Sequence, residues 1–287
     1  MQYLRATDTA QVVRHLLDAG TNGRVLAGGT DLLVQMKSRR VSPVVIVDIK
    51  QLPGAMEIER EGGRYRIGAG VSGAMLGEDV SFVADWPGVA EAAQLIGSTQ
   101  IQGRATMVGN LCNASPAADT VPALIAAGAT AVIEGPGGQR EIAVADIPAG
   151  PGKTTLEPGE FVSAVRLAAR PAGSSDAYLR FIPRSEMDIA VASAGVNLIV
   201  DGDGLVTEAR VALGAVAATA YLDEAAGARL IGTKLEDDVL SELAALCGES
   251  CSPIDDKRGT VAYRRDVVGV LAKRAARIAY QRAKEKA

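Results

Sequence analysis

The chain has 287 residues, of which 48% are hydrophobic and 22% are charged, a composition typical of a globular protein rather than a disordered one. Acidic residues (34) outnumber basic ones (30), and the net charge of −4 argues against a nucleic-acid binder with a large basic surface. One histidine and three cysteines exclude a histidine-rich metal site and an iron–sulfur cluster held by four thiolates of this chain.

Length and hydropathy set the organisation that we expect. A chain of 287 residues fits one large domain or two to three smaller ones. No apolar run approaches the ~20 residues of a membrane span. Residues 1–8 contain no apolar signal core, and an odd number of cysteines without such a signal favours a reducing compartment. We therefore expect a cytoplasmic protein.

The first fifty residues predict a small α/β unit. Apolar residues share one face of a helix expected over residues 8–20, and Gly20 can end that helix. Residues 24–27 indicate a short strand, which is followed by a glycine turn and a second helix beginning near Leu32. The continuous apolar run over residues 44–49 is typical of a buried parallel strand.

The middle of the chain is expected to be mostly antiparallel. A proline near the start and a glycine past the end predict a helix over residues 87–97. Residues 161–167 alternate like a half-buried strand. Glycine-rich turns separate further pairs of short strands. The expected hairpins are residues 56–59 with 65–69 and residues 129–134 with 140–143.

A proline- and glycine-containing stretch over residues 171–176 is the best candidate for a domain boundary. Three strands and then a helical tail are expected after it, with a tight turn over residues 201–204. The expected strands are residues 178–182, 189–200 and 205–215, and the expected helices are residues 220–231, 236–247 and 260–284.

Two glycine motifs resemble nucleotide-binding signatures, and we reject both. Residues 68–73 match G-x-G-x-x-G, but they follow a hairpin rather than the first parallel strand of a dinucleotide fold. Residues 150–154 imitate a P-loop, but Ile147 occupies the position where the first glycine is needed. We expect ordinary turns at both places and no nucleotide hydrolysis.

A third signal consists of two separate loops, residues 27–31 and residues 106–110. Glycines in the first loop allow backbone N–H groups to approach an anion, and the following helix points its positive end to the same place. The second loop is rich in small and hydrogen-bonding residues. Aligned amides and hydroxyls from both loops can solvate a pyrophosphate without a lysine.

These two loops belong to an ordered set of motifs that runs through nearly the whole chain. The set resembles the FAD-binding medium subunits of the molybdenum hydroxylases, the family of xanthine dehydrogenase and aerobic carbon monoxide dehydrogenase. In chain order, the motifs are residues 27–33, 47–49, 67–70, 100–101, 106–111, 114–119 and 263–265.

The resemblance implies an α+β architecture, with a vanillyl-alcohol-oxidase-type FAD-binding fold of two α/β subdomains followed by a C-terminal domain. The expected units are residues 1–52, residues 53–170 with a mostly antiparallel sheet, and residues 171–287 with a three-stranded antiparallel sheet and helices.

The resemblance also implies which residues bind the cofactor. The two loops would hold the FAD pyrophosphate, Asp119 would bind the ribose end, and Ile189 belongs to a stretch beside the flavin ring. The implied cofactor-binding residues are Leu26, Ala27, Gly28, Gly29, Thr30, Asp31, Leu32, Ile101, Thr106, Met107, Val108, Gly109, Asn110, Ser115, Asp119, Leu156, Arg180 and Ile189. The resemblance implies no catalytic acid–base pair and no metal ligand on this chain.

One position departs from the pattern of the family. The family has glycine where this chain has Val108. A β-branched residue tolerates positive φ poorly, so we expect an ordinary negative φ there. Asp31 places a carboxylate near the diphosphate, which is tolerable if the side chain caps its own helix.

By resemblance, the function is electron transfer. Substrate would be oxidised at a molybdenum cofactor in a large partner subunit, and electrons would pass through two [2Fe-2S] clusters of a small partner subunit to FAD on this chain. The complex would be a dimer of heterotrimers with no membrane span and no nucleic acid. The substrate and the final acceptor (quinone, oxygen, NAD or a carrier protein) stay open. Two alternatives are a stand-alone FAD-dependent oxidoreductase and an assembly subunit that has lost FAD.

Side chains outside these motifs have simpler interpretations. Cys112 is expected to be a small buried filler within the second loop region. The basic cluster Lys37, Arg39 and Arg40 is expected to be a solvated helix end, with docking to the small subunit as the minority interpretation.

Overall fold

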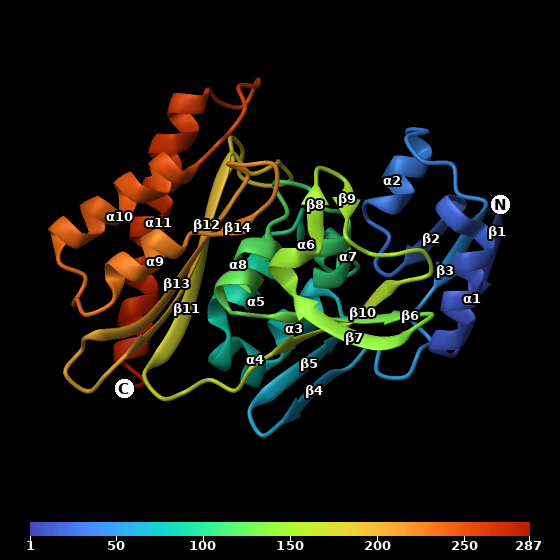
Figure 1. Ribbon diagram of the computed structural model, residues 1–287, viewed down its shortest axis with the longest axis horizontal. Helices are drawn as coiled ribbons and strands as arrows, with labels where there is room; N and C mark the ends of the chain where they lie inside the picture. Colours follow the sequence, from blue (N-terminus) through green and yellow to red (C-terminus); the bar gives the residue numbers. More distant parts are fainter.

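Three main sheets and a small two-stranded one follow one another along the computed structural model, which describes all 287 residues (Figure 1). The parallel N-terminal sheet and the C-terminal sheet lie toward opposite ends of the long axis, and the second sheet and a group of short helices lie between them. No helix combines the length and the apolar character needed to cross a membrane.

The N-terminal sheet is parallel, with strand order β1-β3-β2. Its helix α1 begins after Asp8, whose side chain accepts a hydrogen bond from the Gln11 N–H, and ends at Gly20, as the sequence predicts. The sequence did not predict β1, because three of its four residues are exposed and it contains no apolar run. The elements are β1 (Gln2–Arg5), α1 (Thr9–Ala19), a 3-10 turn (Gly20–Asn22), β2 (Gly23–Leu26), α2 (Leu32–Lys37) and β3 (Val45–Asp48).

The second sheet is antiparallel, with order β4-β5-β10-β6-β7, and both predicted hairpins are present. Its strands are β4 (Ile58–Glu61), β5 (Arg64–Gly68), β6 (Thr130–Gly135), β7 (Gly138–Ala143) and β10 (Phe161–Leu167). The prediction that residues 161–167 are half-buried was wrong. Only Arg166 of β10 is exposed, because this strand is central in the sheet and apolar groups cover both of its faces.

Short helices connect the strands of this sheet. They are α3 (Gly73–Glu78), α4 (Val80–Asp85), α5 (Pro87–Gln94), α6 (Thr99–Gln102), α7 (Met107–Cys112) and α8 (Thr120–Ala126). Both rejected glycine motifs form turns. Residues 68–73 join an antiparallel strand to the six-residue α3, and residues 150–154 lie in a small hairpin. That hairpin consists of β8 (Pro148–Gly150) and β9 (Lys153–Thr154), after a 3-10 turn (Val144–Asp146).

The C-terminal sheet is antiparallel, with order β11-β12-β13-β14. The expected three strands are present, and the two-residue β14 adds a fourth, which is too short to stand out as a pattern in the sequence. Helix α11 covers one face of the sheet, and α5 and α8 of the preceding part cover the other (Figure 1). The elements are β11 (Ser174–Phe181), β12 (Ala192–Val200), β13 (Val206–Gly214), β14 (Tyr221–Leu222), α9 (Glu224–Leu230), α10 (Asp237–Ser250) and α11 (Val261–Lys284).

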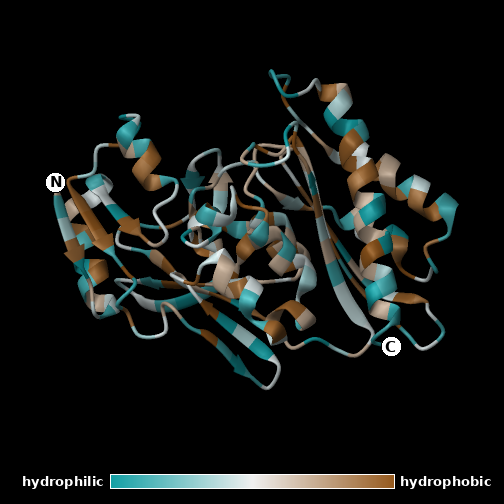
Figure 2. Ribbon diagram, turned by 180° about the vertical axis from the view of Figure 1, so that it is seen from behind, coloured by the Kyte–Doolittle hydropathy of each residue, from teal (hydrophilic) through white to brown (hydrophobic).

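The apolar interior forms two clusters. One joins the first two sheets and their helices, and the other fills the space between the C-terminal sheet and α9, α10 and α11. In Figure 2 the projecting tip of the β4–β5 hairpin is hydrophilic, whereas α11 alternates between hydrophilic and hydrophobic residues. The α+β architecture is confirmed, with the C-terminal antiparallel sheet packed against α5 and α8.

Candidate diphosphate-binding site

Gly28 of the first predicted loop packs against Arg104 and Ala105, which directly precede the second loop, although about 75 residues separate the two loops in the sequence. A Cβ atom built on Gly28 would lie 1.9 Å from the backbone oxygen of Arg104, a distance at which no side chain fits. Gly29 has a φ of 83°, which is the left-handed region that favours glycine. Both glycines are therefore required by the backbone geometry that brings the loops together.

Five consecutive backbone N–H groups of the first loop find no hydrogen-bond acceptor within the chain. Successive free N–H groups in such a turn form a concavity that binds anions. Helix α2 has only six residues, so these loop amides, rather than a long helix dipole, provide the positive potential. We call them the amide cluster, and they belong to Gly28, Gly29, Thr30, Asp31 and Leu32.

The second loop begins the short helix α7. The Thr106 hydroxyl accepts a hydrogen bond from the Gly109 N–H at 2.9 Å and caps this helix. Val108 lies within α7 at a negative φ, as predicted for a β-branched residue, and its N–H has no acceptor within the chain. The replacement of the family glycine by Val108 is therefore compatible with the local backbone.

Side-chain hydrogen bonds fix the walls around the loops. Asn110 Oδ1 accepts hydrogen bonds from the Thr120 N–H at 3.0 Å and from the Thr120 hydroxyl at 2.7 Å, which leaves the Asn110 amide as a free donor. Gln35 on α2 donates to Asn113 Oδ1 at 2.8 Å, and this hydrogen bond directly links the segment after the first loop to the segment after the second. The geometry thus presents donors from both loops to one space.

That space is a cavity of about 430 Å³. Its lining includes eleven of the predicted residues: Ala27, Gly28, Gly29, Thr30, Asp31, Leu32, Thr106, Val108, Gly109, Asn110 and Leu156.

Sequence reasoning missed more than half of the lining, although the missed residues are neighbours of the motifs or belong to β2, β10 and the β8–β9 turn. They are Arg24, Val25, Gln35, Val41, Ile49, Ile96, Ala105, Cys112, Asn113, Gly152, Glu160, Phe161 and Val162. Recognised patterns covered some of them, because Ile49 lies in the motif of residues 47–49 and Gly152 in a recognised turn, but neither was connected to the site.

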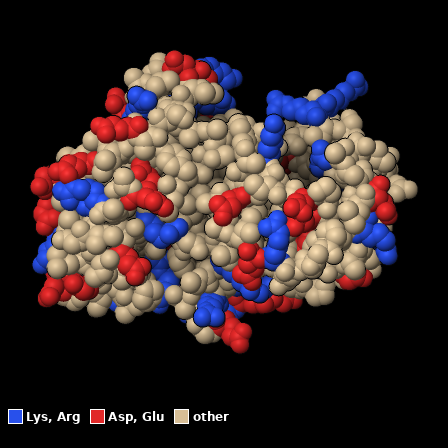
Figure 3. Space-filling view, in the orientation of Figure 1, with Lys and Arg blue, Asp and Glu red and all other residues tan.

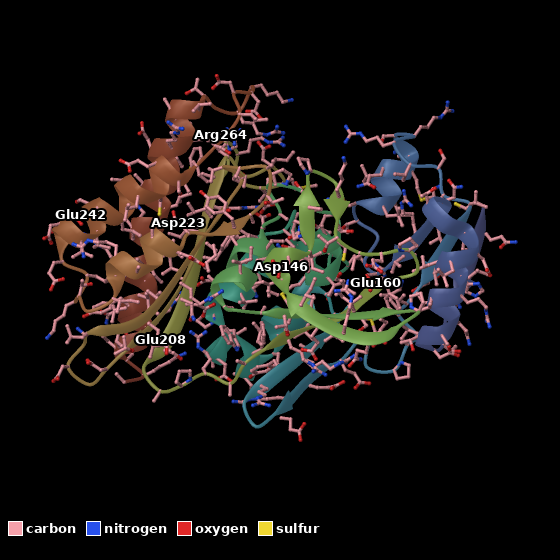
Figure 4. The ribbon with its side chains drawn as sticks, viewed as in Figure 1. Asp146, Glu160, Glu208, Asp223, Glu242 and Arg264 are labelled. Atoms are coloured by element: carbon pink, nitrogen blue, oxygen red, sulfur yellow. The ribbon has the colours of Figure 1, made fainter.

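The charged groups of the lining are largely engaged elsewhere. Arg24 donates to the backbone oxygens of Thr21 and Gly23, both at 2.7 Å. Glu160, which precedes β10 and is labelled in Figure 4, forms a two-point ion pair with Arg140 at 2.7 and 2.8 Å. The cavity therefore offers an anion main-chain donors and neutral polar groups rather than free lysines or arginines.

Comparison with known proteins identifies the family. Residues 1–169 match the family model described as "FAD binding domain in molybdopterin dehydrogenase", and residues 177–279 match "CO dehydrogenase flavoprotein C-terminal domain". The chain belongs to the family of FAD-binding medium subunits of the molybdenum hydroxylases.

Relatives in this family match over nearly their full length. The chain is 35% identical to the carbon monoxide dehydrogenase medium chain of Afipia carboxidovorans, covering 98% of this chain and 97% of the relative. It is 29% identical to the putative xanthine dehydrogenase FAD-binding subunit of Escherichia coli, covering 95% and 93%. A chain of cyanide-inactivated Cu,Mo-CO dehydrogenase superposes with a TM-score of 0.94 at 33% identity, covering 98% of both chains.

Because this family binds FAD, the residues that line the cavity should fit that cofactor. The amide cluster has the donors that a diphosphate needs. Glycine at positions 28 and 29 allows the loop to pack against Arg104 and Leu26 in the conformation that leaves these donors free. The residues present therefore fit the diphosphate of the cofactor that this family binds.

Seven residues that the resemblance implied do not line the cavity. Four of them lie beside the loops and support them: Leu26, Ile101, Met107 and Ser115. Leu26, for example, packs against Gly29, where a Cβ atom would lie 2.8 Å from its side chain. The other three, Asp119, Arg180 and Ile189, lie nearer the C-terminal sheet.

Asp119, which directly precedes α8, forms a buried ion pair with Arg180 of strand β11. The Arg180 Nη1–Asp119 Oδ2 distance is 2.5 Å, and the Tyr178 hydroxyl donates to Asp119 at 3.2 Å. Burial raises the pKa of Asp119 to about 6, although Arg180 and Tyr178 favour the ionised form. The exposed Ile189 lies in the segment between β11 and β12.

Asp31 does not act as the expected helix cap. Its backbone is already helical, and its carboxylate accepts no hydrogen bond from α2. The backbone conformation explains the difference, because a capping residue needs an extended backbone to reach the N–H groups of the first turn. Partial burial raises the pKa of Asp31, and no lysine or arginine pairs with it.

The remaining predictions concern cysteines and basic residues. Cys112 is half-buried and lines the cavity, and burial raises the pKa of its thiol to about 12, so it is not a reactive thiolate. Figure 3 shows lysine and arginine side chains projecting above α2. Lys37 ends this helix, and Arg39 and Arg40 follow it. All three are exposed without ion pairs, which fits a solvated helix end.

Proposed function

We propose that this chain is the FAD-binding electron-transfer subunit of a molybdenum hydroxylase complex. The observation on which the proposal rests is the convergence of the amide cluster with the Thr106–Asn110 loop in a chain of the medium-subunit family. Main-chain donors solvate a diphosphate without requiring a cationic side chain.

Within this proposal, the protein positions the cofactor and shields it from solvent. The amide cluster and the N–H of Val108 bind the diphosphate oxygens, while the free amide of Asn110 supplies a further donor. The apolar lining, including Leu156, excludes water from the same space. When bound, FAD accepts electrons singly and releases them singly or in pairs.

Asp119, Arg180 and Ile189 belong to the proposed site at some distance from the cavity. We place the flavin ring beside the stretch that contains Ile189 and the ribose end near Asp119, where the first part of the chain meets the C-terminal sheet. Of the three predicted units, residues 1–52 and 53–170 then hold the cofactor between them, and residues 171–287 contribute Arg180 and Ile189 to the same binding site.

The names of the relatives support the proposal that this chain works together with partner subunits. They are described as a medium chain and an FAD-binding subunit, which are names for components of larger complexes. We propose that this chain joins a large subunit with the molybdenum cofactor and a small subunit with two [2Fe-2S] clusters. Electrons would pass from those clusters to FAD and then to an external acceptor, in a cytoplasmic dimer of heterotrimers.

The test is to purify the full chain under native conditions, both from its own cells and after expression alone. The native complex is expected to contain molybdenum, iron and FAD. Adding the substrate of the complex is expected to reduce the flavin. The chain expressed alone should be yellow and should release FAD, yet it should oxidise no organic substrate.

Two outcomes would contradict the proposal. A colourless chain in a native complex with molybdenum and iron would indicate an assembly subunit that has lost FAD. Oxidation of an organic substrate by the chain alone would indicate a stand-alone flavoenzyme.

A further inference from the structure

Lys50 makes the only side-chain hydrogen bond to the backbone of residues 27–31. Its ammonium donates to the carbonyl oxygen of Ala27 at 3.2 Å and to Asp48 Oδ1 at 2.7 Å. Lys50 follows β3, so the contact connects the end of one parallel strand to the loop that follows its neighbour β2. The side chain of Lys50 is 24% exposed, and most of its length is buried beneath the loop.

This contact determines how one amide of the cluster points. In a trans peptide the carbonyl of one residue and the N–H of the next point in opposite directions across a rigid plane. Holding the Ala27 carbonyl toward Lys50 therefore turns the Gly28 N–H to the other side of that plane. Gly28 lines the cavity, and its N–H has no acceptor within the chain.

Lys50 is itself held in place by a buried partner. Asp48 is 5% exposed, and it accepts hydrogen bonds from the Lys50 N–H at 3.0 Å and from the Tyr3 hydroxyl. The side-chain stem of Lys50 passes below Gly70, where a Cβ atom would lie 3.5 Å from Lys50 Cγ. These contacts restrict the rotamers of a side chain that would otherwise be flexible.

We propose that Lys50 is a positioning residue for the amide cluster, which it orients by fixing the peptide plane between Ala27 and Gly28. Lys50 acts through the backbone, so it does not touch the diphosphate. This inference rests on the proposed FAD function, because the ligand of the amide cluster is taken to be the diphosphate of that cofactor.

The experiment compares Lys50→Met with wild type and with the control Lys37→Met in the full chain. Lys37 is exposed and has no ion pair, so the control removes one positive charge without removing the carbonyl contact. After removal of the cofactor, the dissociation constants for FAD, ADP and riboflavin are measured by calorimetry. ADP shares the diphosphate with FAD, whereas riboflavin shares only the flavin.

Lys50→Met is expected to weaken FAD and ADP binding by about tenfold, the effect of one hydrogen bond from a charged donor. Its affinity for riboflavin and the affinities of Lys37→Met should match those of wild type. Lys50→Arg, which keeps a cationic donor, should recover part of the affinity for ADP.

The inference is overturned if Lys50→Met binds FAD and ADP as wild type does, or if riboflavin binding falls equally. Equal weakness of Lys50→Arg and Lys50→Met would also reject the carbonyl contact as the cause. These results differ from failure of the proposed function, in which wild type itself would bind neither FAD nor ADP.

Discussion

Single residues at the candidate site matter mainly through the backbone that they allow. Gly28 permits the close approach of Arg104, and Gly29 adopts a positive φ, while the amide cluster stays free of intramolecular acceptors. The side chains of the site mostly orient backbone or other side chains, as Thr120 does for Asn110. Substitutions here should therefore affect binding through geometry rather than through charge.

A methyl group at Gly28 tests this geometry. In Gly28→Ala the new Cβ would meet the rigid backbone oxygen of Arg104 at 1.9 Å, so the two loops must separate. We expect a loss of about 1–3 kcal/mol in the free energy of unfolding and a clear fall in the FAD content of the purified protein. Absorbance of released flavin per chain and denaturant unfolding measure the two effects.

Gly137→Ala is the matched control for that variant. A Cβ atom at Gly137 has no neighbour within 4 Å, and its φ is not positive. The control should keep the FAD content and stability of wild type. Full FAD occupancy in Gly28→Ala would show that the contact between the loops is not needed for binding.

Asp48 provides a prediction about pH. Burial opposes its ionisation, but hydrogen bonds from Lys50 and Tyr3 prevail and hold the pKa of Asp48 below its ordinary value of 3.8. A carboxylate with a lowered folded-state pKa stabilises the protein fully above the unfolded-state pKa. That contribution is lost as the pH falls through the folded-state pKa.

The variant Asp48→Asn should therefore lose about 1–3 kcal/mol of stability at pH 7, because a charged acceptor is replaced by a neutral one. The difference from wild type should shrink as the pH falls below about 4. Urea unfolding between about pH 3 and about pH 7 measures both curves on the two sides of the titration of aspartate. A difference that stays constant over this range would contradict the assigned ion pair.

How far the sequence predicted the site depends on what kind of contact each residue makes. Gly28, Gly29 and Thr106 stand in recognisable local patterns, so the two loops and their pairing were expected. Lys50 and Gln35 act through contacts with residues distant in the sequence, and no local pattern indicates such contacts. Asp31 was expected to cap its helix, but the backbone angle that prevents this is visible only in the structure.

At the level of elements, periodicity and turn residues indicated most helices and hairpins correctly. The exceptions are informative, because β1 and β14 owe their existence to neighbouring strands rather than to apolar residues of their own. The burial of β10 likewise follows from its central place in the sheet, which no local alternation encodes. Pairing with neighbouring strands, rather than a local pattern of residues, thus accounts for what the sequence left undetermined.

Helix packing in the C-terminal part gives a test at this scale. A Cβ atom on Gly269 of α11 would lie 2.6 Å from the backbone oxygen of Ala244 on α10. Alanine gains about 1 kcal/mol over glycine in helix propensity, but overpacking against backbone costs about 1–3 kcal/mol. We expect Gly269→Ala to be destabilising by up to about 2 kcal/mol on thermal unfolding.

The neighbouring residue Val270 supplies the control for this helix. Its side chain is 46% exposed, so Val270→Ala should change the melting temperature little. If Gly269→Ala instead raised the melting temperature, the close crossing of α10 and α11 would be wrong.

For the whole molecule, the seam between the C-terminal sheet and the preceding helices is held by buried polar contacts. Arg170 pairs with Asp176 at 2.9 Å, donates to Asn197 at 2.7 Å and stacks over Trp86 with its guanidinium carbon 4.0 Å from the ring centroid. Asp176 also accepts from the Val89 N–H at 3.0 Å, which ties α5 to β11. At the far end of the same sheet, Arg264 of α11, which is labelled in Figure 4, donates to the backbone oxygen of Val191.

Removing one partner of this buried pair should be costly. Arg170→Met leaves the carboxylate of Asp176, which is 3% exposed, without its cation, and we expect a loss of about 3–5 kcal/mol in the free energy of unfolding. The double variant Arg170→Met with Asp176→Leu should recover part of that loss, because it removes the unpaired charge. Denaturant unfolding of wild type and of the single and double variants gives the coupling between the two residues. Additive losses would contradict a direct interaction.

The contacts that the end of α11 and the residues after it make across this seam have a consequence for the order of folding. Arg282 pairs with Glu91 and Lys286 donates to the Ala84 carbonyl, over separations of 191 and 202 residues. Contacts this distant must close a long loop, so they slow the search for the native topology. The two halves of the molecule should therefore acquire their own cores first and dock late. Hydrogen exchange during refolding should protect the Val89 N–H, which donates to Asp176 across the seam, after the amides of β10.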